Sequence, residues 1–320
     1  MSYLIGVDEA GYGPNLGPLC ISATLWHLPD RPANQDLYDA LRDVVESVPT
    51  GAPGKLVIAD SKQIYSPDRG ITLLEENVLS ALTSLFPLPA SFEQLCQQVV
   101  KQFDVKDKEL ATTTGNGLQL PVAANEKSIC LLGNTFREKS VVVGVQLRDV
   151  SSFLLFANQF NRLLDQYQNK SSLLSHVTLG LVKLLLSKLP EDQPRIVYCD
   201  KHGGRNRYGA LLQTTFPDYL VEVYKESGNE SIYRWGPPKC RTEVRFTVRG
   251  ERFLPSALSS MVSKYLRELS MLQFNRFWRH HLPEIRPTAG YPVDARRFKH
   301  EIAAKQTELG IADDEVWRKK

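Results

Sequence analysis

The spacing of apolar residues predicts a chain that combines strands and helices. Residues 3–7 and 19–26 are apolar runs joined by a loop rich in glycine and proline, which is typical of an antiparallel hairpin. Residues 195–200 form a third run, which ends in an acid, and residues 243–248 form a fourth. These runs predict a sheet.

Apolar residues recur at helical spacing in several other stretches, among them residues 36–48, 152–167, 173–189 and 255–278. The valine-rich residues 141–145 are instead predicted to form a strand. A chain that carries both patterns, with no internal repeat, fits an α/β domain.

Two adjacent acids, Asp8 and Glu9, stand at the end of the first apolar run. Consecutive side chains face opposite ways if the strand continues, whereas a turn would splay both around one point. Carboxylates beside a turn of small residues suit a divalent cation better than a hydrophobic core. The loop alone also permits a plainer interpretation, in which it is a solvated turn that happens to be acidic.

The glycines that follow do not have the spacing of a dinucleotide-binding loop. Gly11, Gly13 and Gly17 form GxGxxxG and not GxGxxG. Pro14 and Pro18 interrupt the place where a phosphate-binding helix would begin, and the preceding acids would repel a pyrophosphate. This class of nucleotide site is therefore excluded for the loop.

Composition adds little until charge is mapped along the chain. The 320 residues are 42% hydrophobic and 23% charged, which is ordinary for one large globular domain or two smaller ones. Residues 241–320 carry 16 Lys/Arg and 10 Asp/Glu, whereas the remaining chain carries 23 and 26. The basic end indicates a polyanionic partner or simply a solvated basic surface.

The five cysteines are widely spaced and form no CxxC pair, so neither a zinc site nor a disulfide framework is indicated. We expect reduced thiols in a cytoplasmic protein. No signal peptide is visible, and no apolar run reaches the roughly 18 residues of a membrane span.

Four acids are candidates for a shared metal site. Asp8, Glu9 and Asp200 follow predicted strands, and Glu268 lies at the edge of the apolar stripe of the long helix at residues 255–278. Strand ends gather at one rim of an α/β sheet, and clustered carboxylates need cations between them. Oxygen ligands favour Mg²⁺ or Mn²⁺, and two such ions about 4 Å apart suit phosphodiester hydrolysis.

Five segments, in order along the chain, resemble the motifs of the type 2 ribonucleases H. They are Val-Asp-Glu-Ala-Gly-Tyr-Gly-Pro at residues 7–14 with Leu-Gly-Pro-Leu at 16–19; Asp-Ser-Lys at 60–62; Ile-Val-Tyr-Cys-Asp at 196–200; Ser-Met-Val-Ser-Lys-Tyr-Leu-Arg-Glu at 260–268; and Gly-Tyr-Pro at 290–292, with His300 and Leu-Gly at 309–310 beyond.

The resemblance implies an α/β chain with an RNase H-like fold, in which a mixed central sheet is flanked by helices and followed by a helical C-terminal extension. Residues 1–250 would form the catalytic domain, with an insertion around residues 87–140, and residues 251–320 would complete the site and the substrate groove. The implied partners are an RNA/DNA hybrid or duplex DNA with a single ribonucleotide, cut to 3′-hydroxyl and 5′-phosphate ends. A monomer is expected.

The resemblance also assigns roles to residues. Asp8, Glu9, Asp200 and Glu268 would be the catalytic residues and the ligands of two Mg²⁺ or Mn²⁺ ions. The substrate would be bound by the backbone of Gly11, Tyr12 and Gly13, which would sense the 2′-hydroxyl, by Ser61 and Lys62, which would hold phosphates, and by Tyr291, which would stack on a sugar.

The chain departs from the family at several points. Tyr12 stands where the family has Arg, Glu268 stands where it has Asp, and residues 226–252 are longer than usual. Within the insertion, residues 111–117 form a polar loop. His202, close to Asp200, is either a proton shuttle or a loop histidine without a role. Two alternatives to hybrid cleavage stay open: a non-catalytic nucleic-acid-binding protein on the same fold, or a nuclease for another structured nucleic acid.

Overall fold

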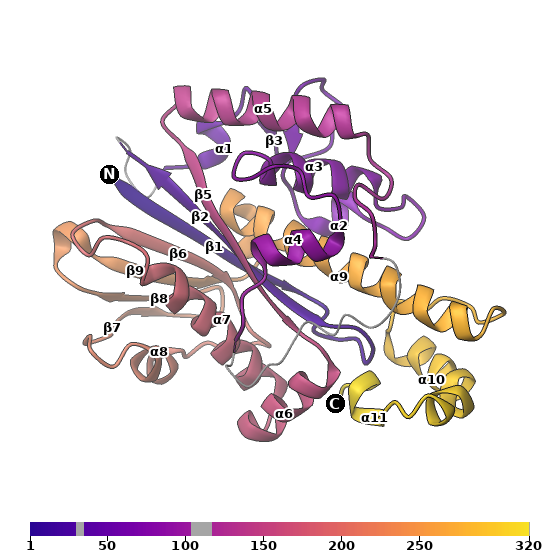
Figure 1. Ribbon diagram of the computed structural model, residues 1–320. Helices are drawn as coiled ribbons and strands as arrows, with labels where there is room; N and C mark the ends of the chain where they lie inside the picture. The colour runs from indigo at the N-terminus through magenta and orange to yellow at the C-terminus, as the bar shows by residue number, and fades with distance from the viewer. Residues whose placement is uncertain (30–34, 104–116, 320) are drawn as a thin grey trace.

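The computed structural model describes residues 1–29, 35–103 and 117–319, and at its centre is a mixed sheet flanked by helices (Figure 1). Within these ranges the strand order is β5-β2-β1-β6-β9-β8-β7. β1 pairs antiparallel with β2 and parallel with β6, which in turn pairs parallel with β9. The strands are β1 (Ser2–Ala10), β2 (Leu19–Leu28), β5 (Gln146–Leu155), β6 (Arg195–Asp200), β7 (Glu222–Glu226), β8 (Glu230–Trp235) and β9 (Thr242–Thr247).

Helices cover both faces of this sheet (Figure 1). Leu4 and Trp26 belong to a core shared with α9 and the helices around it, whereas Ile5 and Val7 belong to a second core with α6 and α7. The first layer contains α9 (Leu254–His281), α3 (Thr72–Leu82), α4 (Phe92–Val99) and α5 (Glu126–Val142), and the second contains α6 (Ala157–Tyr167), α7 (Lys170–Leu186) and α8 (Gly209–Thr215).

Shorter elements complete the described chain. The end of α9 packs with α10 (Pro292–Glu308) and α11 (Asp313–Val316) around a third core that contains Leu16 of the glycine loop. The remaining elements are α1 (Leu37–Ala40), α2 (Ser61–Ile64), the paired strands β3 (Val45–Glu46) and β4 (Leu56–Val57), and the 3₁₀ turns η1 (Pro238–Cys240) and η2 (Gly250–Arg252).

Gly6 sets the distance between β1 and α9. A Cβ at this position would overlap the backbone of Pro255 and Ser256, so the helix can approach the strand only because residue 6 is glycine. Ser259 donates a hydrogen bond to the carbonyl oxygen of Gly6 at 2.8 Å, and Thr24 donates one to that of Pro255 at 2.8 Å. The contact places the start of α9 beside the strand that carries Asp8.

The predicted mixed sheet, the flanking helices and the helical C-terminal region are all confirmed. Three local predictions are wrong. Residues 141–145 are not a strand, because Val141 and Val142 end α5 on its exposed side. Residues 152–155 belong to β5 and not to a helix, because they pair with β2. Residues 36–48 divide into α1 and β3, since Val45 pairs with Leu56.

Residues 104–116 of the predicted insertion, and with them nearly all of the polar loop at residues 111–117, lie outside the described ranges. Among the helices that are described, none is both long enough and apolar enough to span a membrane.

Candidate active site

The carboxyl ends of β1, β6 and β9 meet at one edge of the sheet, where open α/β sheets place their sites. Asp8 and Glu9 lie near the end of β1, and Asp200 is the last residue of β6. Because Val7 pairs with Cys199, the next residues along, Asp8 and Asp200, come side by side. β1 continues to Ala10, so Asp8 and Glu9 leave the strand from opposite faces and do not splay around a turn.

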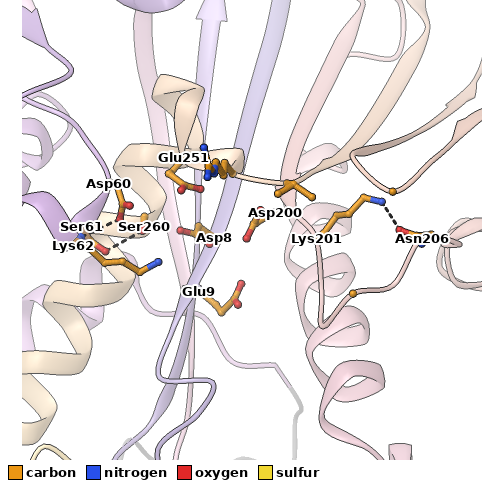
Figure 2. A pocket seen from close by; sticks show the side chains of 14 residues that line it. Asp8, Glu9, Asp60, Ser61, Lys62, Asp200, Lys201, Asn206, Glu251 and Ser260 are labelled. Carbon is orange, nitrogen blue, oxygen red and sulfur yellow. Dashed lines mark hydrogen bonds between the residues drawn. The ribbon is translucent and has the colours of Figure 1, made fainter.

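Asp8, Glu9 and Asp200 nevertheless line one cavity, of about 600 Å³ (Figure 2). Figure 2 shows their carboxylates turned toward a common space, with Lys62 reaching in from one side. The rest of the lining comes from five parts of the chain: Asp60, Ser61 and Lys62; Lys201, Gly204 and Asn206; Gly228; Val248, Arg249 and Glu251; and Ser260 of α9.

Burial and mutual repulsion make the charged forms of these acids costly. The pKa of Asp8 is raised to about 7, chiefly by burial and also by the charges of Asp200 and Glu251, while the hydroxyl of Ser260 opposes the rise. Burial raises the pKa of Glu9 well above its ordinary value, and the charges of Asp8 and Asp200 add to the effect. A cation among these carboxylates would relieve both costs.

The raised pKa of Asp8 gives a testable pH dependence. The unfolded carboxyl titrates near 3.8 and the folded one near 7, so its contribution to stability is complete below pH 3.8 and is lost as pH rises through 7. In metal-free buffer, the melting temperature of the wild type relative to Asp8→Asn is expected to fall from pH 5 to pH 8. Calorimetry of both proteins at several pH values measures this, and a difference that does not vary with pH contradicts it.

Glu268 is not gathered with the other three acids. Ser260 lines the cavity, and Glu268 lies about 12 Å farther along α9. Its carboxylate accepts hydrogen bonds from Tyr65 at 2.7 Å and from Lys264 at 2.8 Å, and Arg267 lies 3.4 Å away. Two cationic side chains and a phenol hydroxyl thus already bind the carboxylate of Glu268 in this arrangement.

The glycine loop is held from beneath by the C-terminus. Gly11 has φ +89°, and a Cβ there would overlap Pro18 and Arg267, so both conformation and space require glycine. The buried guanidinium of Arg318 donates hydrogen bonds to the carbonyl oxygens of Gly11 at 2.6 Å and Pro14 at 3.1 Å. With these carbonyls held inward, the loop is fixed relative to the cavity.

Tyr12 and Gly13 form the outer part of this loop. Tyr12 is half-buried and its hydroxyl lies beside Gly203, close to the strand end that carries Asp200. Gly13 is exposed, and nothing lies within 4 Å of the place a Cβ would occupy. Gly13 therefore leaves room beside the loop, whereas Tyr12 joins the loop to the β6 side of the site.

Truncation of Arg318 is expected to loosen this loop. Arg318→Ala leaves two inward carbonyls without donors, so we expect the free energy of unfolding to fall by about 2 kcal/mol. Amide exchange at residues 11–17 should become faster while exchange in α7 stays unchanged. Exposed Arg296→Ala is the matched control. Equal exchange in the two variants would show that Arg318 does not hold the loop.

The three remaining predicted site residues lie around the loop and cavity. Ser61 is buried in the cavity wall and accepts a hydrogen bond from Ser260 at 3.2 Å, while Lys62 is exposed on the same wall. Tyr291 is 54% exposed, with the guanidinium of Arg267 5.9 Å from its ring centroid. The adjacent Gly290 accepts backbone hydrogen bonds from residues 15 and 16, which places Tyr291 beside the glycine loop.

Two acids at the cavity were not among the predicted site residues. Asp60 caps α2 by accepting a hydrogen bond from the amide of Lys62 at 3.0 Å. Glu251 lies in the turn between β9 and α9. The sequence did contain a signal for Glu251. Residues 243–248 were predicted as a strand, and Glu251 comes shortly after that strand, just as Asp200 stands at the end of its own strand.

Comparison with known proteins gives structural similarity without sequence-level matches. No protein-family model matches the chain, and no curated protein sequence matches it. Among solved structures, ribonuclease H2 from Pyrococcus horikoshii OT3 is 15% identical, with 98% of this chain and 92% of that chain covered and a TM-score of 0.46. RNase HII in a PCNA complex from Archaeoglobus fulgidus is 12% identical, with 99% of this chain and 94% of that chain covered and a TM-score of 0.40. Bst-RNase HIII in complex with Mn²⁺ is 14% identical, with 99% of this chain and 66% of that chain covered and a TM-score of 0.41.

The sheet itself decides the fold class. β1 lies between an antiparallel arm, β2 and β5, and a parallel arm, β6 and β9, with helices on both faces, which is the architecture that the sequence motifs implied. The fold is RNase H-like. The carboxylates lie at the carboxyl edge of this RNase H-like sheet.

The chemistry of the donor set at this cavity fits a hard divalent cation. Carboxylate oxygens of Asp8, Glu9 and Asp200 face the cavity, without sulfur or imidazole among the lining residues. Over the described ranges, however, no three His, Cys, Asp or Glu side chains are grouped closely enough to hold one ion. Asp8 and Glu9 project from opposite faces of β1, which keeps their carboxylates apart. Binding a cation therefore requires these side chains to move closer together around it.

His202 belongs to the core of the RNase H-like domain and not to the cavity. It is 2% exposed, its Nδ1 lies 3.0 Å from the hydroxyl of Ser175, and its ring packs on Tyr208 and Phe246. Burial lowers the pKa of His202 to about 3, so the ring is neutral at neutral pH. Of the two alternatives, this arrangement favours a histidine without a catalytic role.

Proposed function

We propose that this protein is a metal-dependent endoribonuclease that cuts the RNA strand of RNA/DNA hybrids, or single ribonucleotides within duplex DNA. The observation that carries the proposal is the cavity at the carboxyl edge of β1 and β6, into which Asp8, Glu9 and Asp200 all face. Holding several buried, mutually repelling carboxylates in their charged forms is unfavourable. Cations between them would remove that cost, and such cations can promote hydrolysis of a phosphodiester placed in the same space.

In this proposal Asp8, Glu9 and Asp200 hold Mg²⁺ or Mn²⁺. When bound, these cations supply an acidic water as the nucleophile and neutralise the charge on the leaving 3′ oxygen. The carboxylates fix where that chemistry occurs, because they stand on the ends of two adjacent, rigid strands.

The proposed substrate contacts surround the acids. Backbone groups of residues 11–13 lie on a fixed loop next to the cavity and can distinguish a 2′-hydroxyl from hydrogen. Ser61 and Lys62 offer a hydroxyl and a cation for phosphates on the opposite wall, and exposed Tyr291 offers an aromatic face for a sugar. Residues 1–250 would thus supply the acids and residues 251–320 would complete the groove.

Purified protein with Mg²⁺ or Mn²⁺ tests the proposal directly. Four labelled duplexes are compared: an RNA/DNA hybrid, DNA with one ribonucleotide, DNA alone and RNA alone. We expect cleavage of the first two, with 3′-hydroxyl and 5′-phosphate ends, and none after addition of EDTA. Failure to cut either ribonucleotide-containing duplex under any metal condition contradicts the proposal.

The main alternative, a non-catalytic nucleic-acid-binding protein, gives a different result in the same preparation. It predicts duplex binding whose affinity falls steeply with salt, no cleavage by the wild type, and unchanged binding by Asp8→Asn. Binding measured by fluorescence anisotropy at two salt concentrations separates the two functions.

A further inference from the structure

The cavity has a basic side that faces Lys62 across the acids. Figure 2 shows Lys62 on one side of the three acids and Lys201 on the other, where Lys201 extends toward Asn206. We call this second side the basic wall. It is formed by the loops after β6, β7 and β9, and it consists of Lys201, Gly204, Asn206, Gly228, Val248 and Arg249. The proposed cation site uses none of these side chains.

Hydrogen bonds between the three loops hold the basic wall as one unit. Lys201 donates from Nζ to Oδ1 of Asn206 at 2.7 Å and to the carbonyl oxygen of Ser227 at 2.5 Å. The amide of Val248 donates to the carbonyl oxygen of Asn229 at 3.0 Å. Because each loop is bound to its neighbour, the backbone of the wall and the ammonium group of Lys201 have a fixed position beside the end of β6.

Lys201 is a cation without a bound carboxylate. Its two acceptors, an amide oxygen and a carbonyl oxygen, are neutral. Glu226 influences its charge but pairs with Arg207 at 3.8 Å. Glu230 also influences it but pairs with Lys225 at 3.1 Å, and among the described residues no carboxylate forms an ion pair with Lys201. An ammonium group has three donors, so one remains for an anionic ligand.

Arg249 adds a second positive charge to the wall. It is exposed, and no residue within the described ranges forms an ion pair or a hydrogen bond with its guanidinium. Its backbone has φ +59°, a strained conformation for a non-glycine residue that is most often found at functional sites. Nothing lies within 4 Å of the places where Gly204 and Gly228 would carry a Cβ, so a ligand can approach their backbone. Two positive charges and an accessible backbone suit the oxygens of a phosphate.

We propose that the basic wall binds a second phosphate of the substrate strand, next to the phosphate that is cut. The inference rests on the proposed function for the identity of the strand, but its claim concerns binding alone. Since Lys62 and the wall lie on opposite sides of the acids, a strand that crosses the cavity is held on both sides of the scissile bond. This arrangement requires nucleotides on both sides and therefore favours internal cleavage over removal of terminal nucleotides.

Duplex binding by the metal-free protein tests the wall without relying on cleavage. The probe is fluorescent duplex DNA with one ribonucleotide, and its anisotropy is measured in EDTA over a range of salt concentrations. Lys201→Gln and Arg249→Gln are each expected to weaken binding about fivefold and to reduce the slope of log affinity against log salt by about one. Lys201→Arg keeps the charge and should bind within about twofold of the wild type. Arg148→Ala is the matched control, because Arg148 is exposed near the start of β5, at the opposite end of the strands from the cavity.

Uncharged methylphosphonates then locate the contact. Deoxynucleotide phosphates of the ribonucleotide-containing strand are replaced one at a time. Replacement at one position beside the ribonucleotide should weaken binding by the wild type about fivefold, and Lys201→Gln should lose this sensitivity while it keeps the others. A wild type that binds in this pattern but cuts nothing contradicts the proposed function and leaves the wall assigned. Wild-type affinity and salt slope in both Lys201→Gln and Arg249→Gln would overturn the wall, whether or not the wild type cuts.

Discussion

Replacing Asp8 with asparagine is expected to lower the rate of hybrid cleavage at saturating Mg²⁺ or Mn²⁺ by about a thousandfold or more. Asp8 lines the cavity together with Glu9, Asp200 and Glu251, and the charges of Asp200 and Glu251 act on it, so its carboxylate would be a central ligand in the proposed cation site. The loss of about 4 kcal/mol of transition-state stabilisation corresponds to that factor. Single-turnover cleavage of a hybrid with the enzyme in excess measures the chemical step.

The same substitution should stabilise the protein that lacks metal. Asparagine keeps the shape of the side chain but removes a charge that burial and two neighbouring acids disfavour, so the melting temperature at pH 8 in EDTA should rise. Asp218→Asn, an exposed acid away from the cavity, should alter neither quantity. An Asp8→Asn protein that cuts within tenfold of the wild type would remove Asp8 from the site.

The elements that sequence predicted well are those in which one physical signal dominates. β1, β6 and the long helix α9 have uninterrupted apolar patterns, and the acids of the two strands come where those patterns end. The helix predicted over residues 152–167 is confirmed only from Ala157 onward, because Phe153 and Phe160 are buried on the same side of the sheet from a strand and a helix in succession. Apolar spacing alone does not separate that case from one continuous helix.

The site was predictable only as far as strand ends determine it. Asp8, Glu9 and Asp200 stand at the carboxyl ends of two adjacent parallel strands and therefore meet. The contacts of Glu268 instead depend on Tyr65, which is 203 residues away in the chain. The contact of Arg318 with the glycine loop joins residues 307 positions apart. Such pairings depend on how α9 to α11 fold back on the sheet, which no local pattern specifies.

Replacement of Glu75 with glutamine is expected to lower the free energy of unfolding by about 3 kcal/mol. Glu75 is fully buried and accepts hydrogen bonds from the amides of Val122, Ala123 and Ala124 at 2.6–2.8 Å, and from the hydroxyl of Tyr265 at 2.8 Å. An amide offers one acceptor oxygen in place of two and directs its own hydrogens at donors, so buried groups lose partners. Urea unfolding followed by circular dichroism measures the change.

Glu76→Gln is the matched control, because this neighbouring acid is only partly buried and, among the residues that the structure describes, has one hydrogen-bond donor, Ser128. Its effect should stay below about 1 kcal/mol. Since Glu75 joins α3, α9 and the segment before α5, its loss should also speed amide exchange at residues 122–124. Equal stability of the two variants would show that the segment is held by its apolar contacts and that the buried carboxylate contributes little.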